Sequence, residues 1–258
     1  HAFFAATPLQ LFLQISAEMR HHEDSPYHRP ENLQLILNTV NFTGVKLSEH
    51  RRHAGRSFES HGIGTASCGL RVGLSPVAVA GLIAHGLYTN RWDDEEWDYS
   101  WSLCKLRNIV AYAIGAEAEK YLLMFTALTA HGPDATIFHG LAEEMRKNFT
   151  KFDNPFDRDM ILMLLCDEIE EHVAGVQWFT RNWKNRNATF YEDALFMARA
   201  YRNDHMVMLL ERGFAVTQEV FPTENRPVPA RNSEKSSGML HIARYFNDMM
   251  LQANYPEK

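Results

Sequence analysis

Residues 50–90 read HRRHAGRSFESHGIGTASCGLRVGLSPVAVAGLIAHGLYTN, and this stretch decides the fold. It holds four histidines, a first half interrupted by glycines and an apolar second half that ends at His85. Ser75 and Pro76 are typical of a helix N-cap and first turn, which predicts a helix from there to about Tyr88. Apolar residues lie nearly all round this predicted helix, so we expect it to be buried at the centre of the protein.

The first half of the stretch predicts another helix, over residues 56–72, despite Gly62 and Gly64. A glycine inside a helix costs about 1 kcal/mol relative to alanine. Two glycines beside His61 therefore indicate that something approaches this helix closely. Tight packing against another helix and contact with a ligand both explain them, and the residues alone leave the two explanations open.

The rest of the chain shows the same helical periodicity on both sides of this stretch. Apolar patterns predict helices over 8–19, 30–44, 103–113, 116–129, 133–149, 190–202, 204–212 and 237–253. A further helix is predicted to follow Asp157, which we expect to be its N-cap. Nothing alternates as a strand does, so the expected fold is all-α. We expect a helical domain over 1–180 with a helical extension, 181–258, packed on it. Residues 89–102 are acidic and aromatic without a period, which predicts a loop and a candidate lid.

Composition excludes several classes of partner. The net charge of −6 argues against nucleic acid, since phosphate binding needs clustered Lys and Arg. No apolar run approaches the roughly 20 residues of a membrane span, so no membrane is expected as a partner. Three scattered cysteines are too few for a disulfide framework, which favours a reducing compartment, the cytoplasm. The partner expected on these grounds is a small molecule.

Three predicted helices carry the candidate chemistry. His61 and His85 lie 24 residues apart (85 − 61) in small or apolar surroundings. A third helix contains LLCDEIEEH, whose two faces are both apolar enough to bury carboxylates. Four of its polar residues are candidates for a site: Asp167, Glu168, Glu171 and His172. A buried carboxylate is paired or binds a cation, and imidazole with carboxylate suits Zn, Fe, Mn or Ni.

These segments resemble the HD-domain superfamily, all-α metallohydrolases with an H…HD…D set of metal ligands. The resemblance implies an HD-like helical bundle in which His61, His85 and Asp167 hold a divalent transition metal, Fe, Mn or Zn. RNIVAYAIGAEAEKYLLMFTALT, residues 107–129, resembles the helix pair after the HD motif in the hydrolase domain of stringent-response alarmone enzymes. FAATPLQLFLQI, HAGRSFESHGIGTAS and AGLIAHGLYTN are closer still to an uncharacterised HD-like family. The resemblance covers roughly residues 3–175.

The chain departs from the superfamily at Gly86, which stands where the HD pair has aspartate. A glycine offers no side-chain ligand, so the metal would rest on three protein ligands or be lost. Glu168 and Glu171 are candidates for a catalytic base. Either of them, or His53, is also a candidate to replace the missing aspartate as a metal ligand. Two further residues are candidates for substrate binding beside His53: Arg56 for an anion, and Tyr88, just after the second histidine.

Three functions are consistent with this pattern. An enzyme is favoured, most simply a metal-dependent hydrolase of a phosphorylated or nucleotide-like small molecule. A pocket with little or no metal could instead act as a lyase, cyclase or isomerase by acid–base chemistry at His61 and His85. A non-catalytic binding protein is the third hypothesis, in which the loop from Trp92 to Trp101 and the C-terminal helices form a partner or homodimer surface.

Overall fold

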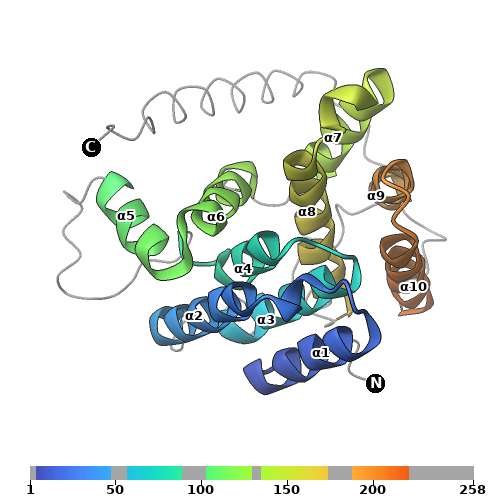
Figure 1. Ribbon diagram of the computed structural model, residues 1–258. Coiled ribbons are helices and arrows are strands. Elements are labelled where there is room, and N and C mark those ends of the chain that lie inside the picture. The colour runs from blue at the N-terminus through green and yellow to red at the C-terminus, as the bar shows by residue number, and fades with distance from the viewer. Residues whose placement is uncertain (1–3, 48–56, 89–102, 130–134, 174–187, 221–258) are drawn as a thin grey trace.

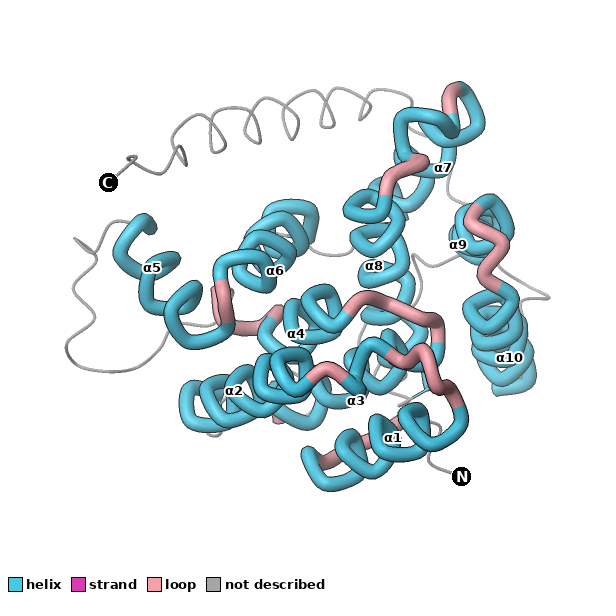
Figure 2. Tube along the Cα trace, viewed as in Figure 1, coloured by secondary structure: helices cyan, strands magenta, loops and turns pink. Residues whose placement is uncertain are grey.

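The computed structural model describes residues 4–47, 57–88, 103–129, 135–173 and 188–220 (Figure 1). These residues form ten α-helices and two 3-10 helices, and they contain no strand, which confirms the all-α prediction (Figure 2). The α-helices are α1 (Pro8–His21), α2 (Pro30–Leu47), α3 (Phe58–Arg71), α4 (Pro76–Ala84), α5 (Leu103–Ile114), α6 (Ala116–Thr129), α7 (Ala135–Lys147), α8 (Pro155–Val173), α9 (Ala188–Ala200) and α10 (Asp204–Val220). The 3-10 helices are η1 (Pro26–His28) and η2 (Phe149–Phe152).

Helix α4 lies at the centre of the bundle, as its apolar sequence predicts. It packs against α2, α3, α6 and α8, and every residue from 78 to 84 is buried. Helix α1 covers the far side of α3, and α5 packs against α2 and α6 (Figure 1). A helix of nine residues is too short to be stable alone in water, so burial on all sides stabilises it.

Side-chain caps explain where the central helices begin. The hydroxyl oxygens of Ser57 and Ser75 accept hydrogen bonds from the backbone N–H of Ser60 and Ala78, so both serines are N-caps. The sequence prediction for Ser75 is confirmed, but α4 ends at Ala84, and residues 85–88 form a turn.

The cap predicted for the helix with LLCDEIEEH is wrong. Helix α8 begins at Pro155, and the Asn154 side-chain oxygen accepts the backbone N–H of Asp157 at 2.9 Å. Asn154 is therefore the N-cap. Asp157 instead lies within the first turn, where a carboxylate faces the positive end of the helix dipole. Proline is common at the first helical position, and Pro155 occupies that position here.

Gly62 and Gly64 of α3 lie against two different neighbours. A Cβ on Gly62 would lie 2.5 Å from the carbonyl oxygen of Ile83, so this glycine lets α4 approach α3 closely. A Cβ on Gly64 would overlap the carboxylate of Glu170 on α8. One glycine thus serves helix–helix packing, and the other makes room for a buried acidic side chain.

The C-terminal helices pack on the rest of the bundle. Helix α9 contacts α7, and α10 contacts α8 and α9 (Figure 1). The Asn203 side-chain amide also donates to the carbonyl of Val72 at 2.7 Å, which ties this region to the end of α3. The predicted boundary near residue 180, the loop 89–102 and the helix 237–253 lie outside the described residues. No helix among those described is both long and apolar enough to cross a bilayer.

Candidate metal centre

Two histidines and an aspartate from three different segments meet inside the bundle. His61 comes from the first turn of α3, His85 caps the C-terminus of α4, and Asp167 comes from α8. The ligand atoms of the three side chains lie within 4.8 Å of one another, and all three residues are buried. Asp167 Oδ1 is 2.9 Å from His61 Nε2 and 3.5 Å from His85 Nε2. The structure therefore brings together the three residues that the sequence selected as ligands.

The other nitrogen of each imidazole contacts an acceptor in the protein. His61 Nδ1 is 2.7 Å from Glu170 Oε2, and His85 Nδ1 is 2.6 Å from the carbonyl oxygen of Leu82. A proton on each Nδ1 satisfies both contacts and leaves the Nε2 lone pairs directed toward Asp167. Such outer hydrogen bonds fix the tautomer and orientation of metal-binding histidines.

This donor set is suited to a divalent transition metal. Two neutral imidazoles and one carboxylate are ligands that Zn and Fe(II) accept, with further positions left for water or substrate. The two rings meet edge to face with their centroids 4.7 Å apart, and Phe125 of α6 packs against His85 at 5.4 Å. Apolar and aromatic walls of this kind hold the ligand side chains in place.

The carboxylates beside Asp167 are buried as the sequence predicted. Glu168 and Glu171 are 1% and 6% exposed, and Glu171 lies one turn along α8 from Asp167. Sequence reasoning missed Glu170, which is the residue that contacts His61. The sequence offered only a spacing: Glu170 follows Asp167 by three residues, as Gly64 follows His61 by three. The structure places the Glu170 carboxylate against Gly64.

The structure describes one of the three residues that the sequence selected for substrate binding. Arg56 and His53 lie outside the described residues. Tyr88 is described, and its hydroxyl donates to Glu119 Oε1 at 2.7 Å. The same carboxylate accepts two hydrogen bonds from Arg107, at 2.7 and 3.0 Å. Glu119 is another functional candidate that the sequence analysis did not select.

A second polar network lies at the N-terminal end of α4, opposite the end capped by His85. The Asp159 carboxylate accepts hydrogen bonds from the Ser75 hydroxyl at 2.5 Å and from the Tyr121 hydroxyl at 3.4 Å. Burial raises the pKa of Asp159, and burial together with the nearby Asp159 charge raises the pKa of Tyr121 to about 12. This network joins the first turn of α4 to α6 and α8.

Two cysteines, Cys68 of α3 and Cys166 of α8, lie in the hydrophobic core. Both are free and buried. Burial raises the pKa of the Cys166 thiol well above its ordinary value, and the neighbouring Cys68 raises it further. A thiol that resists ionisation is a poor nucleophile and a poor metal ligand, so Cys166 is a core residue.

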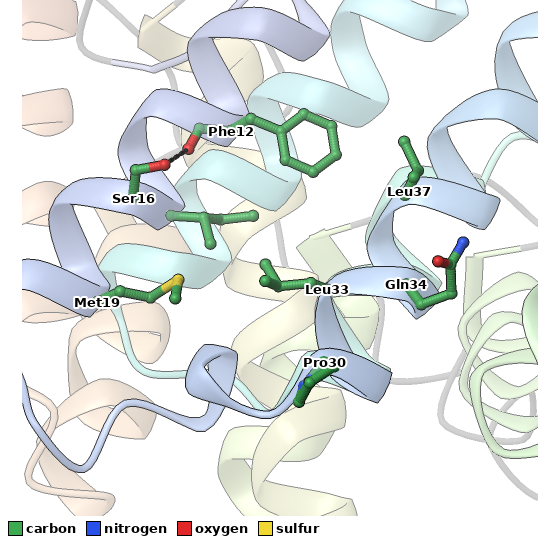
Figure 3. Close-up of a pocket in the computed structure, with 8 residues that line it drawn as sticks. Phe12, Ser16, Met19, Pro30, Leu33, Gln34 and Leu37 are labelled. Carbon is green, nitrogen blue, oxygen red and sulfur yellow. Dashed lines mark hydrogen bonds between the residues drawn. The ribbon is translucent and has the colours of Figure 1, made fainter.

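An apolar groove lies apart from the histidines, between α1 and α2 (Figure 3). Its volume is about 460 Å³. The groove is lined by Phe12, Ile15, Ser16, Met19, Pro30, Leu33, Gln34 and Leu37. None of these side chains titrates or provides a strong metal ligand, so the groove has no residues for acid–base or metal chemistry.

Comparisons with known proteins found no match to this chain among protein-family models, curated proteins or solved structures.

Proposed function

We propose that this protein is an HD-like metalloenzyme in which His61, His85 and Asp167 hold one divalent transition metal. The single observation that carries the proposal is the shared orientation of the two imidazoles. Both Nδ1 atoms contact acceptors, and both Nε2 atoms face the same Asp167 oxygen. A histidine that serves only the core needs no such convergence with a second histidine.

The proposed reaction is hydrolysis. A metal held by these three residues would supply a Lewis acid, which would lower the pKa of bound water and polarise the substrate oxygen. Glu170 and the Leu82 carbonyl contact the Nδ1 atoms of the imidazoles, which leaves both Nε2 atoms facing Asp167. Glu171, one turn from Asp167 on the same helix, is the candidate for accepting the proton released in the reaction, and Glu168 is the alternative.

A phosphorylated or nucleotide-like small molecule is the proposed substrate. This part of the proposal rests on the resemblance to HD hydrolases. In the same proposal Arg56, just before α3, contacts the substrate anion, because guanidinium binds phosphate oxygens in pairs. A panel of phosphomonoesters and nucleotides assayed for released phosphate tests this part separately from metal binding.

Metal analysis of purified protein tests the site itself. Wild-type protein should contain about one equivalent of transition metal after loading and desalting. His61→Ala, His85→Ala and Asp167→Asn should each lower this content severalfold. His22→Ala is the matched control, since His22 is an exposed histidine of the α1 terminus and its loss should leave the content unchanged. Wild-type protein that retains no stoichiometric metal would overturn the proposal.

One observation favours a second candidate, acid–base catalysis without metal. The ring of His61 lies between two carboxylates, with Nδ1 at 2.7 Å from Glu170 and Nε2 at 2.9 Å from Asp167. That geometry also suits an imidazolium that exchanges protons with its neighbours, as in a lyase, cyclase or isomerase. Gly86→Asp separates the two candidates. A Gly86→Asp variant that binds more metal than the wild type but shows no more of the native activity would favour the metal-free reaction.

A further inference from the structure

The ligand His85 lies outside the helix that delivers it. Helix α4 ends at Ala84, and His85 begins a turn over residues 85–88. Within this turn the backbone N–H of His85 bonds to the Leu82 carbonyl at 3.4 Å, and the N–H of Leu87 bonds to the Ala84 carbonyl at 2.8 Å. A residue in a turn is held by fewer backbone hydrogen bonds than one inside a helix, so its orientation depends on how the turn is anchored.

The anchor of this turn is Glu119, in the first turn of α6. Its side chain is fully buried, with 0% exposure, and its two oxygens accept one hydrogen bond from Tyr88 and two from Arg107. Tyr88 is the last described residue of the turn, three positions after His85. The carboxylate therefore joins the turn to α5, which carries Arg107, and to α6.

Helix α6 contacts both ends of this turn. Phe125 packs its ring against His85, and Glu119 holds Tyr88. Bidentate pairing of a carboxylate with guanidinium is geometrically specific, so Arg107 fixes the direction from which Glu119 meets the tyrosine. The two contacts together restrict rotation of the turn about the end of α4.

We propose that Glu119 is a positioning residue for the metal centre and that it acts on His85 through the Tyr88 hydroxyl. This inference rests on the proposed metal site. It also gives Tyr88 a role different from substrate contact. The hydroxyl holds the turn, and the turn holds His85 Nε2 toward Asp167.

Binding of Co²⁺ to metal-free protein tests the inference without any substrate. Tyr88→Phe removes one hydroxyl and leaves the Arg107–Glu119 pair intact. We expect its Co²⁺ affinity to fall about threefold to tenfold, below the 10–100-fold typical of a residue that bonds a ligand directly. We also expect a shifted visible Co²⁺ absorption spectrum, which reports ligand geometry. Glu119→Gln should lower the affinity further.

Tyr201→Phe is the matched control, since its hydroxyl donates to the Phe152 carbonyl at 3.0 Å in another part of the bundle. It should change thermal stability as much as Tyr88→Phe but leave the affinity and spectrum for Co²⁺ at wild-type values. Wild-type affinity and spectrum in Tyr88→Phe would overturn this inference alone. Failure of the wild-type protein to bind Co²⁺ would overturn it together with the proposed metal site.

Discussion

Gly64→Ala tests whether Glu170 supports the metal centre, because it changes neither Glu170 nor a ligand. The new Cβ would occupy the place of the Glu170 carboxylate, which must then move away from His61. The substitution therefore acts on the hydrogen bond to His61 Nδ1 from the opposite helix. Because the colliding atoms end a flexible side chain, the helices themselves can remain in place.

The magnitude follows from two opposing effects. Alanine stabilises a helix by about 1 kcal/mol relative to glycine. Displacement of a buried carboxylate from its partner costs roughly 3–5 kcal/mol, and Glu170 is only 1% exposed. The net expectation is a loss of about 2–4 kcal/mol in the free energy of unfolding. Metal affinity should fall about 10–100-fold, which corresponds to about 1.4–2.8 kcal/mol.

Urea unfolding of metal-free protein and competitive metal titration measure the two effects. Gly69→Ala is the control on the same helix, since its Cβ would meet the methyl groups of Leu74 and Leu82 rather than a polar group. It should alter stability without lowering metal affinity more than twofold. If Gly64→Ala binds metal as tightly as the wild type, then Glu170 does not support His61, and this reasoning is refuted.

Two further predictions concern stability. Burial raises the pKa of Asp159 in the folded protein above its ordinary value of 3.8. The folded state therefore keeps the proton to a higher pH than the unfolded state does, and the protein loses stability as pH rises from 3.8 through the raised pKa. Asp159→Asn, whose oxygen can still accept a hydrogen bond from the Ser75 hydroxyl, should therefore gain stability relative to the wild type as pH rises above that ordinary value, as followed by urea unfolding. A difference that is constant with pH would contradict this. On α1, Leu11→Ala should cost about 2–5 kcal/mol and Leu9→Ala less than about 0.5 kcal/mol, since the two side chains are 0% and 70% exposed. Equal losses in thermal unfolding would contradict the packing described for this helix.

Local sequence determined the helices and most of their starting points. Ser75 with Pro76 marked the start of α4, and its unbroken apolar run indicated burial on every side, because local chemistry alone sets capping and periodicity. The same reasoning misplaced the cap of α8. Asp157 and Asn154 are both good caps, and only the proline at 155 distinguished them. The end of α4 was also overestimated, since hydrophobicity continues to Leu87 while the helix stops at Ala84.

The sequence by itself also selected His61, His85 and Asp167, through residue type and resemblance, and the structure brings these three together. Only the tertiary structure decided which neighbours support them. Glu170 contacts His61 from a helix more than a hundred residues away in the chain, and Glu119 reaches Tyr88 across 31 residues. Such contacts depend on how whole helices are placed against one another. Periodicity indicates which face of a helix is buried, but it does not specify which side chain of another helix meets that face.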